Sequence, residues 1–300
     1  MALRIRQVRK LLRRQPPRQN DRERLSRPAT SEPAASRSPG AAKSSAARNR
    51  ALLVNFFRRE LTTRYLGSVS GLAWALLSPL AMLAVYHFVF TNIFRATSFA
   101  GQSFLAFVAV ALWPWLAAQE ALQRGALSLA GYSGMIRKVA FPHEFVVLAS
   151  VFATFALQFA GYVAVLLVLK LAGEPIHLSG LVIAIPVWLV LVVAIVGITF
   201  ALAALQVFVR DVEHVLMPIL MILMYLTPIL YPLSLVPANL RVWVAANPFN
   251  WVVARLREAL LDGHLGVHPS DAVAVAVALL LFAGGRWVFR RLSPHFEDFV

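Results

Sequence analysis

Residues 65–94 contain no Lys, Arg, Asp or Glu, and they follow directly on a basic segment that ends at Arg64. Within this stretch, residues 72–90 are apolar and just long enough, as a helix, to cross a hydrocarbon core of about 30 Å. The change from basic to uncharged sequence therefore predicts the point at which the chain leaves a membrane surface and enters the bilayer.

The composition of the whole chain is that of an integral membrane protein. Of the 300 residues, 59% are hydrophobic and 14% are charged, whereas a soluble domain has about 25% charged residues. The absence of Cys excludes disulfides, thiolate metal sites and thiol nucleophiles. Zinc-protease, nucleophile-elbow and Walker phosphate-loop motifs are also absent from the sequence. We therefore expect no catalytic, cofactor or metal site in this chain.

Positive charge is concentrated near the start of the sequence. Residues 1–48 hold 13 of the 29 Lys and Arg residues but only 3 of the 14 Asp and Glu residues. Because Pro, Ser, Ala and Arg dominate residues 15–48, the segment 1–48 is predicted to be a disordered basic cytoplasmic tail. Attraction to anionic lipid headgroups is the functional alternative. Residues 49–300 then form one transmembrane domain.

Residues 50–66 have the periodicity of an amphipathic helix, with apolar residues at steps of one, three and four and a basic opposite face. This pattern is typical of a helix that lies in the membrane interface. Its candidate contacts to lipid headgroups are Arg58, Arg59, Arg64 and Tyr65, because arginine suits bidentate phosphate recognition. The alternative is a short helix that packs on the protein's own loops.

Six apolar segments predict membrane-spanning helices, at about residues 72–90, 104–122, 145–169, 181–207, 215–233 and 272–289. Basic residues gather in the loops after the second and fourth segments and after the sixth. Such loops are normally cytoplasmic, which places both termini inside. The fold class predicted is an all-α integral membrane protein with an interfacial amphipathic helix before the first span.

Residues 245–261 are apolar and amphipathic but too short for a full span. Asn247 and Pro248 have the residue types of a helix N-cap and first turn. A segment of this length is more typical of a re-entrant or interfacial helix than of a spanning one. We therefore expect short outer re-entrant helices before the last span; an ordinary extracytoplasmic helix is the alternative.

The cytoplasmic loop 131–144 is a candidate docking surface. Basic Arg137 and Lys138 precede an apolar pair, Phe141 and Pro142, and Glu144 ends the loop. An exposed apolar knob flanked by charges is typical of a contact with another protein. A loop that merely lies at the membrane edge is the alternative.

Aromatic and ionisable residues inside the predicted spans are the remaining candidates. Trp113, Trp115, Tyr225 and Tyr231 could stack on sugar rings and line a pore, or pack in the core or against lipid. Glu120 is a functional candidate because it lies within a span, but it is also spaced to pair with Arg124 one helical turn away.

Several short motifs occur in a characteristic order: RYLGSVSGLAW (residues 64–74), WPW (113–115), IRKVAFPHE (136–144), VRDV (209–212), NPF (247–249) and RLSPHF (291–296). Together they make residues 50–300 similar to the transmembrane subunit of ABC-2-type polysaccharide exporters. That group includes permeases for O-antigen, capsule and teichoic acid. The basic tail lies outside the resemblance.

The resemblance implies a homodimer in the cytoplasmic (inner) membrane, with a channel at the dimer interface for a lipid-linked glycan. It also implies two copies of a cytoplasmic ABC ATPase, which would bind ATP and Mg and act through residues 136–144 as a coupling helix. Residues 245–261 would be outer re-entrant or gate helices. Two other hypotheses remain: an ABC-2 permease for a drug or small lipid, and a membrane-bound glycosyltransferase, against which the lack of paired loop carboxylates counts.

Overall fold

Helices make up nearly all of the structure. The computed structural model describes residues 39–65, 71–93, 98–99, 102–136 and 141–299. The α-helices are α3 (Pro39–Tyr65), α4 (Gly71–Phe88), α5 (Phe104–Leu127), α6 (Ser133–Ile136), α7 (Glu144–Leu171), α8 (Leu181–Phe208), α9 (Val212–Leu226), α10 (Ala238–Ala245), α11 (Pro248–Leu260) and α12 (Pro269–Leu292).

Short elements connect these helices. A π-helical turn, η1 (Val89–Ile93), extends α4, and the 3-10 turns are η2 (Ala130–Tyr132), η3 (Leu178–Gly180), η4 (Leu233–Leu235) and η5 (Ser293–Asp298). Strands β1 (Ser98–Phe99) and β2 (Gln102–Ser103) pair antiparallel before α5, with Ser98 opposite Ser103. The side chain of Ser103 then caps α5 by accepting a hydrogen bond from the Ala106 N–H.

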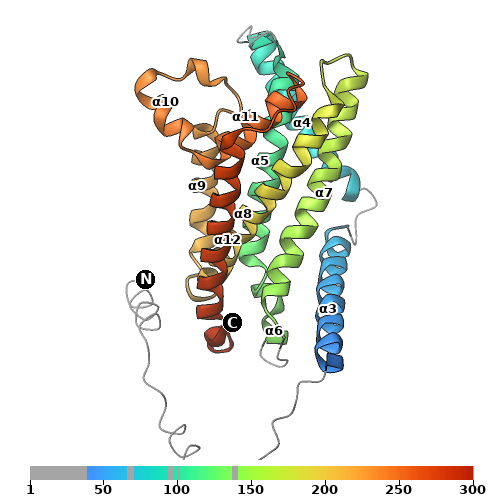
Figure 1. The fold of residues 1–300 in the computed structure, drawn as a ribbon, viewed down its shortest axis with the longest axis vertical. Helices are drawn as coiled ribbons and strands as arrows, with labels where there is room; N and C mark the ends of the chain where they lie inside the picture. Colours follow the sequence, from blue (N-terminus) through green and yellow to red (C-terminus); the bar gives the residue numbers. More distant parts are fainter. Residues whose placement is uncertain (1–38, 66–70, 94–97, 100–101, 137–140, 300) are drawn as a thin grey trace, which may run out of the picture.

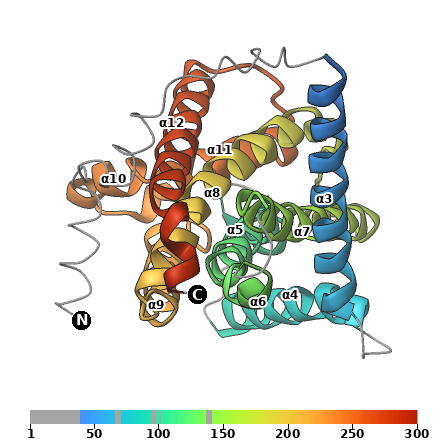
Figure 2. The same cartoon turned by 90° about the horizontal axis from the view of Figure 1, so that it is seen from below.

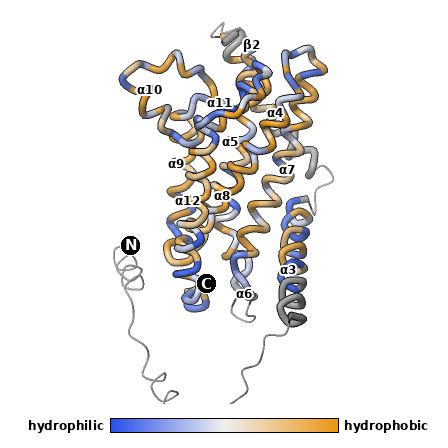
Figure 3. Tube along the Cα trace, viewed as in Figure 1, coloured by the Kyte–Doolittle hydropathy of each residue, from blue (hydrophilic) through white to orange (hydrophobic). Residues whose placement is uncertain are grey.

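The long helices run up and down a common direction (Figure 1). We call the lower end of Figure 1, which holds α6, the start of α7 and the end of α12, the lower end of the molecule. The upper end holds strand β2, the α7–α8 connection and α10 (Figures 1 and 3). Consecutive long helices therefore begin at opposite ends, as expected of a chain that repeatedly crosses a membrane.

Four described segments are long and apolar enough to cross a membrane: Phe104–Leu127, Glu144–Leu171, Leu178–Phe208 and Pro269–Asp298, with mean hydropathies between 1.5 and 3.1. Hydrophobic residues dominate the middle of these helices, and hydrophilic residues gather toward their ends (Figure 3). These features confirm the prediction of a helical, multi-pass membrane protein. The other two predicted spans fall on α4 and α9, which have 18 and 15 residues.

Helix α5 is the central helix of the bundle (Figure 2). In its most apolar 18-residue window 78% of the residues are buried within the subunit, compared with 17% for the α12 segment. Small side chains explain this burial, because they allow neighbouring helices to approach closely. The fully buried alanines of α5 include Ala106, Ala109, Ala111, Ala117 and Ala121.

Helices α8 and α12 cross in close contact at two glycines. A Cβ on Gly285 would lie 1.8 Å from the backbone oxygen of Gly197, and a Cβ on Gly197 would lie 2.4 Å from that of Leu281. Since real side chains never approach so closely, each position requires glycine for this crossing. The crossing therefore fixes the distance between the two helices.

Helix α9 differs from the predicted fifth span at residues 215–233. It ends at Leu226, and Thr227 has the extended backbone (φ −96°, ψ 135°) that is favoured before a proline such as Pro228. The expectation of a helix to residue 233 is therefore wrong, because the proline ends it. By contrast, the predicted start of the short helix α11 is confirmed: Asn247 is its N-cap, accepts a hydrogen bond from the Phe249 N–H, and precedes Pro248.

Helix α3 begins at Pro39 and so includes residues 39–48 of the predicted tail; the earlier residues lie outside the described part. Part of its apolar face is covered by the protein. Phe56 is buried, and its ring centroid lies 5.3 Å from that of Tyr132 and 5.6 Å from that of Phe141. Packing on the protein's own loops, one of the two alternatives read from the sequence, therefore holds for this part of the helix.

Candidate functional site

The predicted docking loop lies at the lower end of the molecule. Arg137 and Lys138 fall outside the described residues. Phe141 is half-buried against Phe56, and its ring centroid lies 5.0 Å from the His143 ring, whereas Pro142 is exposed. The expectation of an exposed knob at Phe141 is therefore wrong in this structure, because α3 packs over the ring. Of the predicted apolar pair, Pro142 is the exposed residue.

Glu144 joins the end of this loop to the last spanning segment. It is the first residue of α7, and its carboxylate pairs with Arg286 at 3.2 Å and with Arg290 at 2.7 Å, both on α12. An acidic residue in the first turn also interacts favourably with the positive end of the helix dipole. The loop is thus connected electrostatically to α12.

A recess of about 540 Å³ opens beside this ion pair. Its walls come from Asn49 of α3, the loop at residues 141–143, the C-terminal half of α12 and η5. His143 lies in the wall between the rings of Phe141 and Phe296, and burial lowers its pKa although nearby Glu297 acts in the opposite direction. Burial therefore favours the neutral imidazole, and the recess has an aromatic wall with a charged rim.

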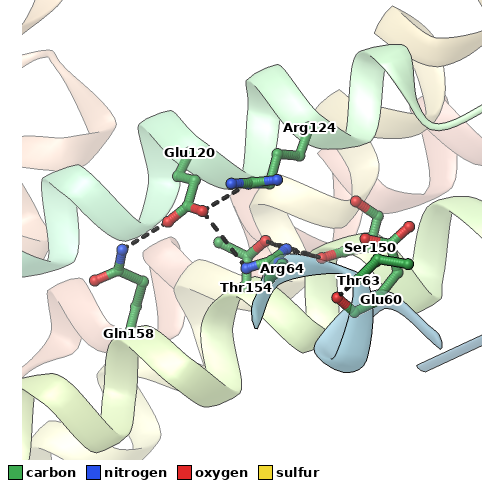
Figure 4. A network of polar contacts seen from close by, with 8 residues as sticks. All are labelled: Glu60, Thr63, Arg64, Glu120, Arg124, Ser150, Thr154 and Gln158. Atoms are coloured by element: carbon green, nitrogen blue, oxygen red, sulfur yellow. Dashed lines mark hydrogen bonds and ion pairs between the residues drawn. The ribbon is translucent and has the colours of Figure 1, made fainter. Parts of the chain in front are cut away.

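A polar network joins α3, α5 and α7 within the bundle (Figure 4). At its centre, Glu120 Oε1 pairs with Arg124 Nε at 2.6 Å and with Arg64 at 3.5 Å, and Glu120 Oε2 accepts a hydrogen bond of 2.7 Å from Gln158. The pairing of Glu120 with Arg124, one alternative read from the sequence, is thus present. The additional partners from α3 and α7 were not predicted.

Arg64 is the residue that brings α3 into this network. Its guanidinium donates to Thr154 Oγ1 and, at 3.4 Å, to the carbonyl oxygen of Ser150, both on α7. The three arginines expected to face lipid headgroups are therefore in different environments: Arg58 is exposed, Arg59 lies 4.6 Å from the Tyr132 ring centroid, and Arg64 is almost fully buried. The side chain of Tyr65 lies outside the described residues.

The second cavity is a partly open apolar groove of about 520 Å³ between α5, α8, α9, α11 and α12. Three aromatic side chains line its α5–α11 side: Trp115, Phe249 and Trp251. The rings of Trp115 and Phe249 meet edge to face at 5.0 Å, and Trp115 Nε1 donates to Gln119. Of the four predicted pore residues, only Trp115 lines this groove.

The other three predicted pore aromatics lie elsewhere. Trp113 is 1% exposed, donates to the Gln158 carbonyl at 2.8 Å and packs directly on Gly161, so its ring belongs to the α5–α7 contact. Tyr225 is exposed near the upper end of α9, and the Tyr231 hydroxyl donates to its carbonyl at 2.7 Å. These two tyrosines are therefore close to one another but apart from Trp113.

Two arginines of α11 make contacts that were not predicted from the sequence; Arg255 is buried and Arg257 is half-buried. Arg257 donates to the carbonyl oxygens of Phe107, Pro228 and Ile229 at 3.2, 2.7 and 2.6 Å and lies 3.4 Å from the Phe107 ring centroid. It thus provides hydrogen-bond donors to carbonyls of α5 and of the non-helical segment that follows α9. A charged residue within an apolar amphipathic helix was the signal available.

Arg255 secures the other side of α11. It pairs with Glu258 at 2.6 Å and with Asp271 of α12 at 2.9 Å, and it donates to the Gly266 carbonyl at 2.7 Å. Asp271 also accepts a hydrogen bond from Trp251 Nε1. Helix α11 is therefore attached to α5, to the end of α9 and to the start of α12. Among the described residues, no three His, Asp or Glu side chains gather as metal ligands.

Comparison with known proteins assigns the fold to a family. The profile of the ABC-2 type transporter family matches residues 52–261, which include α5, α7, α8, α9, α10 and α11. The O-antigen export system permease protein RfbA of Myxococcus xanthus is 29% identical over 254 residues, which cover 84% of this chain and 96% of that protein. A Klebsiella pneumoniae RfbA permease is 26% identical, with 83% and 95% covered.

A second kind of relative is the polysialic acid transport protein KpsM of Escherichia coli. It is 24% identical over 230 residues, which cover 76% of this chain and 88% of that protein. Since the family profile covers more than half of the sequence, the chain is a member of the ABC-2 type transporter family.

Proposed function

We propose that this chain is the membrane-spanning subunit of an ABC exporter that moves a lipid-linked polysaccharide out across the cytoplasmic membrane. The observation that carries the proposal is the near full-length similarity to permeases for O-antigen and for polysialic acid. These relatives are named for different sugar polymers, so what they share with this chain is the handling of a polysaccharide.

The proposed topology has six spans and both termini in the cytoplasm. Helix α4 with its π-helical extension and helix α9 supply the two spans beyond the four long apolar segments. At about 1.5 Å per residue, the 15 residues of α9 extend about 22 Å, so α9 and the short outer helices α10 and α11 would share the crossing. Four basic residues lie where helices end at the lower end: Arg124 in the last turn of α5, Arg210 between α8 and α9, and Arg290 and Arg291 at the end of α12. This placement supports a cytoplasmic lower end.

ATP hydrolysis is assigned to a separate subunit that binds ATP and Mg. The sequence has no Walker phosphate loop, so the chain itself lacks the motif that would cradle a nucleotide. The recess at the lower end offers an aromatic wall and a charged rim for that subunit. We propose that the loop at residues 136–144 is the coupling segment, and that Glu144 transmits its movement to α12.

A homodimer with two ATPase copies is proposed to enclose the channel. One face of α9, with Leu216, Leu220 and Met224, is buried in the subunit, while the opposite face is exposed. Tyr225 is 54% exposed on that side. With Tyr231 beside it and Trp115 in the groove, it supplies candidate aromatic lining; Trp113 is left out because the subunit encloses its ring.

One observation favours a second candidate function, export of a drug or small lipid. The apolar groove of about 520 Å³ falls within the size range of about 300–1,000 Å³ of pockets that hold small molecules. The near full-length relatives are all named for polysaccharides, which makes this the second choice.

The test is reconstitution in proteoliposomes with a separately expressed ABC ATPase subunit. The chain alone should hydrolyse no ATP, and the complex should move a lipid-linked glycan only when ATP is present. Stimulation of ATP hydrolysis by small apolar compounds, but not by lipid-linked glycan, would support the second candidate instead. ATP hydrolysis by the purified chain without any second polypeptide would contradict both.

A further inference from the structure

The Glu120 network contains a geometry suited to a phosphate group. Two guanidinium groups, from Arg64 of α3 and Arg124 of α5, converge on one carboxylate oxygen, Glu120 Oε1 (Figure 4). Arginines that bind carboxylate oxygens in this way bind phosphate oxygens by the same charge-assisted hydrogen bonds. We propose that Glu120 occupies the place of a phosphate group of the substrate, which displaces it and releases α3; this inference rests on the proposed function.

The two ion pairs of Glu120 differ in strength. The Arg124 pair, at 2.6 Å, has the length of a strong charge-assisted hydrogen bond, whereas the Arg64 pair, at 3.5 Å, is at the limit of one. On α7, Arg64 donates to two neutral groups, the Thr154 hydroxyl and the Ser150 carbonyl. The contact between Arg64 and Glu120 is therefore the one that a competing anion replaces most easily.

Access to the network is from the Arg124 side. The side chain of Arg64 is 6% exposed, that of Glu120 is 29% exposed and that of Arg124 is 48% exposed. A phosphate group thus reaches Arg124 first and meets Arg64 only after Glu120 has moved aside. Gln158, which donates to the other oxygen of Glu120, would then remain the partner of the displaced carboxylate.

Displacement of Glu120 has a consequence for α3 because Arg64 lies in the last turn of that helix. In this structure, Arg64 holds the end of α3 against both α5 and α7. A phosphate bound between Arg64 and Arg124 would draw Arg64 toward the exposed side and away from α7. The anionic group of the substrate would thereby change the position of α3 before any ATP is hydrolysed.

The test measures binding of farnesyl diphosphate, a soluble prenyl diphosphate, to the full chain in neutral phosphatidylcholine nanodiscs without ATPase. Removing the competing charge with Glu120→Gln should tighten binding about tenfold, and Arg64→Gln should weaken it. A tightening cannot come from structural damage, which would weaken binding. Glu213→Gln, which removes an exposed carboxylate at the start of α9, is the matched control and should change nothing.

Three further probes identify the source of the phosphate. Farnesol should not bind, because it lacks the phosphate. If inorganic pyrophosphate also binds Glu120→Gln about tenfold more tightly than the unmodified chain, the site recognises the phosphate alone. If only farnesyl diphosphate binds the variant more tightly, the site recognises a lipid-linked phosphate. If nanodiscs containing phosphatidylglycerol abolish this difference in affinity by competition, ordinary anionic lipids also enter the site. Each of these three results supports the displacement of Glu120 by a phosphate group.

A second measurement leaves the network intact. The chain has no native Cys, so spin labels can be placed at Val54→Cys on α3 and Phe152→Cys on α7, both partly exposed positions. Farnesyl diphosphate should shift the distance between the labels, and Glu120→Gln should shift it in the same direction without ligand. Unchanged binding in Glu120→Gln together with an unchanged label distance would overturn the inference. Neither the binding assay nor the distance measurement needs glycan or ATPase. If both give the expected shifts but the reconstituted complex does not export glycan, only the proposed function is refuted.

Discussion

Replacing Gly285 by alanine should destabilise the protein by separating α8 from α12. The new Cβ would lie 1.8 Å from the Gly197 oxygen, and ordinary contact begins at about 3.4 Å, so the backbones would have to move apart by about 1.6 Å. Overpacking of this kind costs about 1–3 kcal/mol, and the displacement also loosens the neighbouring contact of Phe200 with Phe289, whose centroids are 5.2 Å apart. The better helix propensity of alanine offsets less than about 1 kcal/mol of this cost.

The adjacent glycine gives a matched control. A Cβ on Gly284 meets nothing within 4 Å, so Gly284→Ala retains the gain in helix propensity without the clash. Thermal unfolding in nanodiscs should therefore show a lower Tm for Gly285→Ala, by about 4 °C or more for about 2 kcal/mol, and an unchanged or higher Tm for Gly284→Ala. Equal Tm values for the two variants would refute the close crossing of α8 and α12.

Three other substitutions test contacts described above. Asn247→Ala removes the cap of α11 and should lower the free energy of unfolding by about 1 kcal/mol, measured by denaturant titration in detergent; no change would mean that the cap is dispensable. Arg257→Gln removes the guanidinium donors of buried carbonyls in α5 and in the segment after α9 and should cost about 2–4 kcal/mol, whereas Arg241→Gln, at an exposed site, should cost less than about 0.5 kcal/mol in the same titration. Glu144→Gln should change stability by at most about 1 kcal/mol, because Arg286 and Arg290 are partly exposed, but should reduce glycan export per ATP hydrolysed; unchanged coupling would exclude its proposed role.

Features with a local cause could be predicted from the sequence. The long apolar runs are helices in the structure because a helix satisfies its own backbone in lipid. The start of α11 followed from Asn247 and Pro248, which act within one turn, and the Glu120–Arg124 pair followed from spacing on one helix. The end of α9 also has a local cause, because Pro228 follows Thr227. The predicted span nevertheless continued to residue 233, because the residues after the proline are apolar as well.

Features that depend on distant parts of the chain could not be predicted. Arg64 has the sequence context of an interfacial residue, and only the packing of α3 on α7 encloses it. Phe141 is half-buried because Phe56, far away in the sequence, lies against it. The need for glycine at position 285 comes from the backbone of another helix, and no pattern within α12 reveals it.

The charged contacts explain how particular helices pack together in a membrane, where the hydrophobic effect does not determine which helices associate. Between helices in lipid, apolar surfaces gain little by meeting one another, so close backbone contacts and polar pairs determine which helices associate. Three carboxylates do this at three levels: Glu144 joins α7 to α12, Glu120 joins α5 to α3 and α7, and Asp271 joins α12 to α11. The three carboxylates are partly exposed, and so are their partners Arg124, Arg286 and Arg290, whereas Arg64 and Arg255 are almost fully buried. An ion pair that solvent reaches is worth little free energy. The pairs with exposed arginines can therefore be exchanged at small energetic cost, which a subunit that must change shape in every transport cycle requires.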